Sequence, residues 1–251
     1  MVKDNKYGDF YSKGYQIFPD ILSLGEVGEY KTKLDSIHQK QIKQFGIDSL
    51  KLIQEVGIVR SPFLYDSTFQ DIFYNRFTKS IVKDIIGDHA ILSLQNAIIV
   101  EPGTKHHQSF YHRDIIYQNF VSSKPLAINL YFCLDEYNSD NGATIFRIGS
   151  HKKDYFDSED TSEIARAPAG SVIMFDSMIY HKAGANTSRN KRYGINNMYT
   201  LPFLKQQISY PNAIKSCPAD PELAQMLGFK SREFSSVDEF RQYRLDRITN
   251  E

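Results

Sequence analysis

The apolar residues of the first third of the chain recur at the spacing of a helix, at Val27, Tyr30, Leu34 and Ile37. Such a pattern is typical of an amphipathic helix that buries one face. Ser23, followed three positions later by Glu26, forms a capping-box signature, so we expect a helix over residues 24–45. A second helical pattern covers residues 67–86 and ends at Gly87, a residue type common after helix ends.

From residue 91 onward the pattern changes to short apolar runs separated by clusters of turn residues. The runs are AILSLQNAIIV (90–100), KPLAINLYFCLDEY (124–137), ATIFRIG (143–149), GSVIMFDSMIYH (170–181) and RYGINNMYTLPF (192–203). Short strands between turn clusters predict an all-β sandwich or barrel rather than alternating strands and helices. An earlier run, GYQIFP (14–19), also predicts a short strand.

The expected plan is therefore mainly β, with helices packed around a central jelly-roll core. We expect a helical N-terminal part at about 20–87, a β core at about 91–204 and a helical C-terminal tail. No linker-like segment interrupts the pattern, so residues 1–251 are predicted to form one domain.

The charge balance narrows the possible partners. Thirty basic residues offset thirty acidic ones, so the chain lacks the basic surplus typical of proteins that bind nucleic acids or membrane surfaces. Its two cysteines do not make a disulfide framework, and its N-terminus has no apolar signal segment. We therefore expect a cytoplasmic protein that acts on a small molecule. No pattern indicates an oligomeric state.

The segment YHRDIIYQNF (111–120) holds His112 and Asp114 two positions apart. In a strand, residues i and i+2 point to the same face, so the imidazole and the carboxylate would lie side by side. The pair alone has two interpretations. It is either an ion pair on the surface of a half-buried strand or two of the three ligands of a metal.

A third ligand would have to come from the other histidines, which are 38, 89, 106, 107, 151 and 181. His38 falls on the polar side of the first helix, the next three lie in turns or loops, and His151 opens a charged stretch. His181 ends a long apolar run, where a scaffold can hold a ligand rigidly. Together with His112 and Asp114 it would form the 2-His-1-carboxylate triad of non-haem Fe(II) sites.

Arg192 strengthens this interpretation. It follows His181 by eleven positions (192 − 181 = 11) and opens the next strand, which we expect to be antiparallel to the one carrying His181. A buried arginine without a carboxylate is costly, and the neighbouring strands offer no acidic partner. The far carboxylate of 2-oxoglutarate, gripped by the planar guanidinium, would supply one.

These motifs, taken in order, resemble the phytanoyl-CoA dioxygenase family of Fe(II)/2-oxoglutarate-dependent oxygenases, which have a double-stranded β-helix fold. The likeness runs from FYSKGYQIFPDILS to PFLKQQ and includes H-x-D, NGATIFRIGSH and the arginine eleven after the histidine. It implies that His112, Asp114 and His181 hold iron and that Arg192 binds the cosubstrate. Ile148 replaces the proline that the family usually has before Gly-Ser-His, which affects a turn and not the chemistry.

Three further residues are candidates for contacts with 2-oxoglutarate or the substrate. The resemblance implies a cosubstrate contact for Gln95, although it is equally readable as a satisfied polar residue on a strand. Asn129 and Tyr131 alternate on the face of their strand opposite Ile128 and Leu130. They would contact cosubstrate or substrate if that face lines the cavity, and otherwise they are ordinary surface residues of the sandwich.

The function that follows is oxidation of a C–H bond in a small organic metabolite, with Fe²⁺, 2-oxoglutarate and O₂, releasing succinate and CO₂. Hydroxylation is expected first, with desaturation or ring formation open, in specialised metabolism. Related iron halogenases have glycine or alanine at the carboxylate position, so Asp114 argues against halogenation. Two alternatives stay open: a cupin-like metal dioxygenase that needs no 2-oxo acid, and an inactive binding or regulatory member of the fold. Specificity is expected to lie in loops 43–67 and 104–110 and after Pro202.

Overall fold

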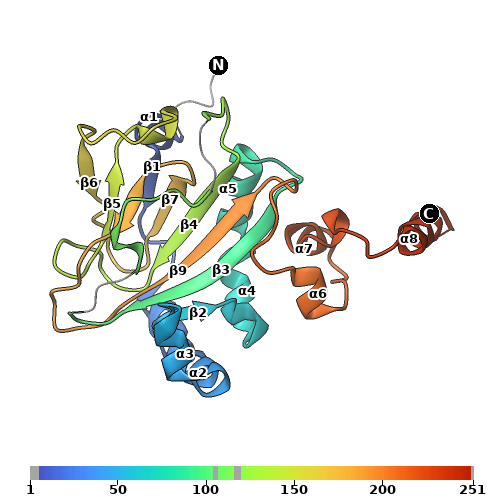
Figure 1. Cartoon of the computed structure of the whole chain (residues 1–251), viewed down its shortest axis with the longest axis horizontal. Helices are drawn as coiled ribbons and strands as arrows, with labels where there is room; N and C mark the ends of the chain where they lie inside the picture. The colour runs from blue at the N-terminus through green and yellow to red at the C-terminus, as the bar shows by residue number, and fades with distance from the viewer. Residues whose placement is uncertain (1–5, 104–106, 116–119, 250–251) are drawn as a thin grey trace.

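Two antiparallel sheets lie opposite each other in the computed structural model, which describes residues 6–103, 107–115 and 120–249 (Figure 1). The larger sheet has six strands in the order β1-β7-β4-β9-β3-β2, and the smaller has three in the order β6-β5-β8. The strands are β1 (Tyr15–Phe18), β2 (Ile58–Arg60), β3 (Ile91–Val100), β4 (Ala127–Cys133), β5 (Thr144–Arg147), β6 (Ser162–Ile164), β7 (Val172–Asp176), β8 (His181–Ala183) and β9 (Arg192–Thr200).

Helices cover one face of the large sheet, and α8 lies apart from it at the C-terminal end (Figure 1). The helices are α1 (Gly8–Lys13), α2 (Leu24–Phe45), α3 (Ile47–Leu52), α4 (Gln70–Phe73), α5 (Arg76–Ile85), α6 (Tyr210–Ile214), α7 (Pro221–Met226) and α8 (Val237–Thr249). Short 3₁₀ turns are η1 (Pro62–Leu64), η2 (Ser67–Phe69), η3 (His107–Ser109), η4 (Ser150–Lys152) and η5 (Phe229–Ser231). Apolar residues of α2, α4 and α5 form the main core with β3, β4, β7 and β9, whereas α8 buries none of its residues. None of the described helices is long and apolar enough to cross a membrane.

Strand β4 separates two cores, as its alternating pattern predicts. Ile128, Leu130 and Phe132 pack against the helical layer, whereas Tyr131 packs in a second cluster with residues of the small sheet. One face of the large sheet is thus sealed by helices, and the other faces the small sheet. The predicted double-stranded β-helix with flanking helices is confirmed.

The first helix is also confirmed, because α2 begins and ends at the expected residues. Its capping box is complete: the Glu26 amide donates to the Ser23 hydroxyl (3.3 Å), and the Glu26 carboxylate accepts from the Ser23 amide (2.8 Å). The second helical pattern is interrupted, however. Asn75 leaves the helical conformation and caps α5 by accepting from the Thr78 amide at 2.8 Å, so the expected helix is divided into η2, α4 and α5.

The run over residues 170–181, expected as one strand, is two strands in different sheets. The Asp176 side chain accepts from the Met178 amide (2.8 Å), and the Ile179 amide donates to the Asp176 carbonyl (3.0 Å). This local turn ends β7 and sends the chain across to the small sheet, where β8 pairs with β5. His181 therefore begins a strand of the small sheet and does not end one in the large sheet. The expected pairing of Arg192's strand with His181's is wrong too, because β9 pairs with β3 and β4.

Two other expectations need correction. The segment 43–67, expected as a loop, contains α3, β2 and η1, and β2 extends the large sheet with Val59 fully buried. His38, expected on a solvated face, is 7% exposed and accepts from the Gly57 amide at 3.3 Å. Of the loop expected at 104–110, residues 104–106 lie outside the described part of the chain, His106 among them.

The buried turn at Asp176 predicts a pH effect on stability. Burial raises the pKa of Asp176 to about 6, against the opposing effects of the Met178 amide and Arg113. The folded state therefore binds more protons than the unfolded state between about pH 4 and 6, so this group's contribution to stability falls as pH rises through that window.

In Asp176→Asn, an isosteric change that keeps the acceptor oxygen, this fall should disappear. The free energy of unfolding of the variant minus that of wild type should therefore be more positive at pH 7 than at pH 4, by up to a few kcal/mol. Urea denaturation of both proteins across this range measures the difference. Parallel pH profiles would show that Asp176 does not titrate in this way.

Candidate metal centre

The H-x-D segment is not a strand, contrary to expectation, but backbone hydrogen bonds hold it firmly. His112 and His181 form one isolated bridge in which each amide donates to the other's carbonyl at 3.0 Å. The Asp114 amide donates to the Ser177 carbonyl at 3.0 Å. Both ends of the segment are therefore tied to the stretch that crosses from the large sheet to the small one.

Arg113, between the two candidate ligands, anchors the segment from the other side. Its side chain is 5% exposed and donates to the carbonyls of Ser150 (2.7 Å) and Lys153. The guanidinium also stacks on the Tyr180 ring, 4.1 Å from its centroid. This buried arginine gives an irregular segment the rigidity that the sequence argument assigned to a strand.

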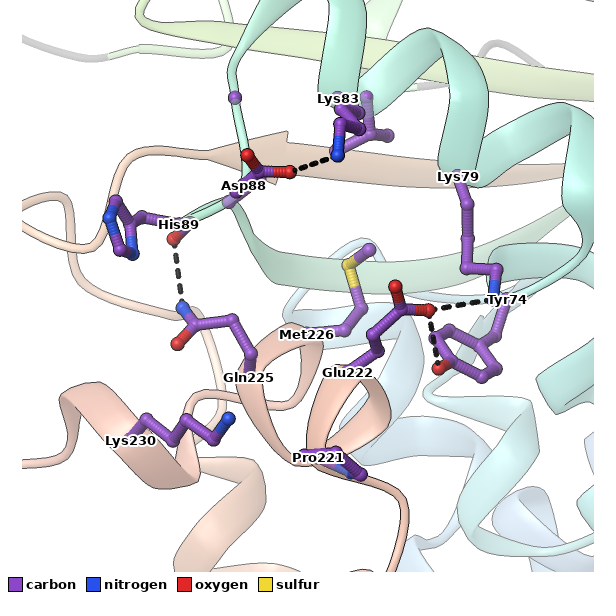
Figure 2. Close-up of a pocket in the computed structure, with 13 residues that line it drawn as sticks. Tyr74, Lys79, Lys83, Asp88, His89, Pro221, Glu222, Gln225, Met226 and Lys230 are labelled. Atoms are coloured by element: carbon purple, nitrogen blue, oxygen red, sulfur yellow. Dashed lines mark hydrogen bonds and ion pairs between the residues drawn. The ribbon is translucent and has the colours of Figure 1, made fainter.

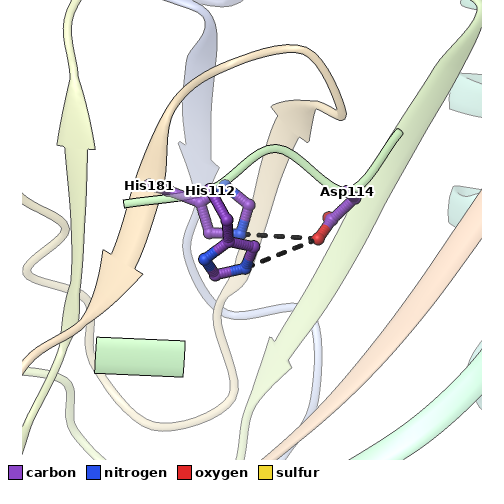
Figure 3. A group of neighbouring side chains, drawn as sticks. All are labelled: His112, Asp114 and His181. Carbon is purple, nitrogen blue, oxygen red and sulfur yellow. Dashed lines mark ion pairs between the residues drawn. The ribbon is translucent and has the colours of Figure 1, made fainter. Parts of the chain in front are cut away.

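The structure brings His112, Asp114 and His181 together, with one ligand atom of each within 4.8 Å of the others. Figure 3 shows both imidazoles directed toward the same carboxylate oxygen. The distance from Asp114 Oδ1 is 3.9 Å to His112 Nε2 and 3.6 Å to His181 Nε2. His151, which the sequence does not favour as a ligand, lies in η4 and is not part of this group.

The backbone also fixes which ring nitrogen each histidine presents. Nδ1 of His112 lies 2.9 Å from the Phe110 carbonyl, and Nδ1 of His181 lies 3.0 Å from the Ile179 carbonyl. Since a carbonyl only accepts, each Nδ1 carries the proton and each Nε2 keeps its lone pair. Burial lowers the pKa of His181, which favours the neutral form that a metal requires.

Asn129 orients the carboxylate. It is fully buried, and its amide nitrogen donates to Asp114 Oδ2 (2.7 Å) and to the Ser177 hydroxyl (2.9 Å). This leaves Asp114 Oδ1 facing the two Nε2 atoms. Two neutral imidazoles and one carboxylate, each held by an outer hydrogen bond, fit a non-haem Fe(II) ion.

Arg192 lies in the same pocket as these three residues and is 3% exposed. Its Nη1 donates to the Gly142 carbonyl at 2.6 Å, and the Tyr137 ring lies 4.4 Å from the guanidinium carbon. Within the described ranges no carboxylate forms an ion pair with it, and its Nε has no partner. A Cβ at Gly194 would overlap Tyr137 and Tyr131, so the bare glycine backbone lets both rings pack beside the arginine.

The other predicted contacts divide into three cases. Tyr131 lines the pocket, as one outcome of the alternation argument requires. Asn129 faces the same side but lies behind Asp114, where both ends of its amide are already bonded. Gln95 points to the opposite face and does not line the pocket, so the structure agrees with its other interpretation, a satisfied polar residue on a strand, and not with a contact to cosubstrate.

The position of Gln95 follows from a β-bulge. The register of β3 shifts between Leu92 and Leu94, which reverses the alternation beyond it. The Gln95 amide consequently bonds the Phe69 carbonyl (2.9 Å), Asn197 Oδ1 (3.1 Å) and the Phe63 amide (3.1 Å). It joins the large sheet to the helical layer.

Sequence reasoning missed Asn196, which also lines the pocket. It lies four positions after Arg192 on β9, and residues an even number apart share a face of a strand, so alternation from Arg192 could have found it. The pocket also includes Thr144 and Phe175, from strands of the two different sheets. Its walls thus come from both sheets.

A second pocket lies between α5 and α7, away from this centre (Figure 2). Most of its charged groups bond to one another: Lys83 pairs with Asp88 (2.8 Å), and Glu222 pairs with Lys79 (2.8 Å). Gln225 donates to the His89 carbonyl at 2.9 Å. These paired groups offer no convergent set of free ligand atoms.

Comparison with known proteins gives a consistent picture. A family model described as phytanoyl-CoA dioxygenase (PhyH) matches residues 10–194. An uncharacterized protein of Mycobacterium tuberculosis is 29% identical over 241 residues, covering 91% of this chain and 88% of the relative. A dioxygenase of Talaromyces verruculosus, cdmA, is 27% identical over 175 residues, which are 64% of this chain and 59% of that protein.

Among solved structures, EctD from S. alaskensis, determined with 2-oxoglutarate and 5-hydroxyectoine, is similar with a TM-score of 0.66. The match covers 80% of this chain and 77% of EctD at 17% identity. At this identity the likeness concerns the fold, and it agrees with the two-sheet architecture described above.

The contact between Asn129 and Asp114 predicts an effect on metal affinity. Asn129→Ala removes the donor to Asp114 Oδ2 and frees the carboxylate to rotate. Affinity for Fe(II) should fall by about 10–100-fold, the usual effect of losing an outer hydrogen bond to a ligand. Anaerobic metal titration followed by fluorescence or calorimetry measures it.

Gln95→Ala serves as the matched control, because it removes an equally buried amide from the other face of the sheet. It should lower the free energy of unfolding and leave metal affinity within error of wild type. Equal metal affinity in wild type and Asn129→Ala would contradict the orienting role of Asn129.

Proposed function

The chain belongs to the phytanoyl-CoA dioxygenase family, and from this premise we propose that it is an Fe(II)- and 2-oxoglutarate-dependent oxygenase. In this proposal it oxidises a C–H bond of a small organic metabolite and releases succinate and CO₂. One observation carries the proposal. Two histidine Nε2 atoms converge on one carboxylate oxygen in a pocket that also contains a buried arginine, and this arginine has no carboxylate partner among the described residues.

His112, Asp114 and His181 would hold the iron. Nε2 of His112 supports this assignment, because the atom is buried and has no hydrogen-bond partner among the described atoms. When bound, iron supplies the activation of O₂, coupled to decarboxylation of the 2-oxo acid, that oxidises the substrate. A facial set of three protein ligands leaves positions open for cosubstrate and O₂.

Arg192 would bind the far carboxylate of 2-oxoglutarate. Its Nε has no hydrogen-bond partner in the described part of the molecule, so this N–H can donate to an acceptor. A carboxylate can accept two parallel hydrogen bonds from a guanidinium. The Gly142 carbonyl and the Tyr137 ring fix the guanidinium before the cosubstrate arrives. Tyr131, on the adjacent strand, lines the same pocket.

A metal dioxygenase that uses no 2-oxo acid would leave Arg192 buried without a counter-charge, at a cost of several kcal/mol. An inactive binding protein would not need two imidazoles and a carboxylate held by separate outer hydrogen bonds. These considerations favour the oxygenase. The proposal includes a role in specialised metabolism. The expected reaction is hydroxylation, with desaturation and cyclisation as the alternatives.

The direct test is anaerobic titration of the protein with Fe(II) and then with 2-oxoglutarate, followed by exposure to O₂ and assay of succinate. We expect one Fe(II) per chain and succinate only when 2-oxoglutarate is present. Iron binding without succinate would favour a dioxygenase of another kind, and absence of iron binding would favour the inactive alternative.

His181→Ala and His151→Ala form a matched pair for this titration. The first should lose iron binding, whereas the second should keep it, because His151 lies outside the ligand group. Loss of iron in His151→Ala alone would show that the third ligand has been misassigned.

Arg192→Lys tests the cosubstrate site. Lysine keeps the charge but loses the planar fork, so the binding of 2-oxoglutarate should weaken by about 1.5–3 kcal/mol. Iron affinity should stay unchanged, since Arg192 is not a ligand. An unaltered 2-oxoglutarate affinity would refute this role for Arg192.

A further inference from the structure

Three buried side-chain atoms around the pocket have no hydrogen-bond partner in the described part of the molecule: His112 Nε2, Arg192 Nε and Asn196 Oδ1. Under the proposed function a metal takes the first and a cosubstrate carboxylate the second. The third is a hydrogen-bond acceptor. Ionised 2-oxoglutarate has only acceptor oxygens, so it cannot satisfy Asn196 Oδ1.

The orientation of the Asn196 amide follows from the network behind it. The Asp114 carboxylate accepts only, so Asn129 must present its nitrogen to Asp114 and its oxygen to Asn196. Asn196 then donates through Nδ2 to that oxygen at 2.8 Å. Turning the Asn196 amide over would place two oxygens in contact. The acceptor character of Asn196 Oδ1 is therefore set by the carboxylate that would bind the metal.

We propose that Asn196 is a specificity-determining residue that accepts a hydrogen bond from the organic substrate. This inference rests on the proposed function and adds a chemical class to it: the substrate carries a hydroxyl or an N–H group. Ile98, Phe175 and Ala183 give the same pocket an apolar wall, so the donor group is attached to a partly apolar carbon skeleton. A molecule with only ether or carbonyl oxygens would leave Asn196 Oδ1 unpaired.

The test measures binding and not turnover. The protein is loaded with Zn(II), which does not react with O₂, and with 2-oxoglutarate. It is then titrated with matched sets of small cyclic and branched fragments, in which an alcohol or amine is replaced by its methyl ether and by the plain hydrocarbon. Ligand-detected NMR gives the relative affinities.

Wild type should bind the alcohols and amines about tenfold more tightly than their ethers, because only the former can pair with a buried acceptor. In Asn196→Ala this preference should disappear, so that alcohols, amines and ethers bind with about equal affinity. Asn96→Ala is the matched control: Asn96 lies directly opposite Asn196 in the β3–β9 ladder but does not line the pocket. It should keep the tenfold preference.

The inference is overturned if wild type shows no preference, as when water satisfies Asn196, or if the preference survives in Asn196→Ala. Loss of the preference in Asn96→Ala as well would also overturn it, since the effect would then come from the sheet in general. Failure of the proposed function is seen separately, as absence of bound metal or as absence of 2-oxoglutarate-dependent succinate formation. In that case the same fragment series on the unloaded variants still decides whether the preference depends on Asn196.

Discussion

The paired backbone hydrogen bonds between His112 and His181 are the constraint on which the centre depends. They join a segment without regular structure to the first residue of β8, each amide donating to the other's carbonyl. The turn at Asp176 makes this possible, because it ends β7 early and carries the chain to the small sheet. Both histidines thereby lie in the gap between the sheets, and the fold imposes their distance from Asp114.

A second layer of hydrogen bonds gives these side chains their chemical character. Backbone carbonyls select the tautomer of each imidazole, and Asn129 selects the oxygen that Asp114 presents. The same amide sets the orientation of Asn196, so the metal ligand and the proposed substrate contact belong to one network. Arg192 stands outside this network and is held by a carbonyl and an aromatic ring.

The sequence predicted the elements whose signals are local. Residues 24–45 carry their own capping box and apolar stripe, and α2 has those bounds. The break at Asn75, the turn at Asp176 and the bulge beside Leu94 each depend on one side chain or one extra residue. Periodicity does not report such features, and the bulge reverses the alternation of β3 before Gln95.

The candidate ligands come together through a geometry that the sequence does not predict. Strand alternation would place His112 and Asp114 side by side, yet they converge through a single bridge and the Arg113 anchor. What the sequence did contain was the chemistry: the residue types, their order and an arginine without an acidic partner. Asn196 follows Arg192 by four positions on β9, so alternation along that strand also predicts it to face the pocket.

The most direct measurement is an anaerobic crystal structure of the protein with Fe(II) and 2-oxoglutarate. The account predicts iron bound to Nε2 of His112 and of His181 and to Oδ1 of Asp114, with the far carboxylate of 2-oxoglutarate on Arg192. Iron bound through Nδ1 of either histidine, or a cosubstrate carboxylate held by other residues, would contradict it.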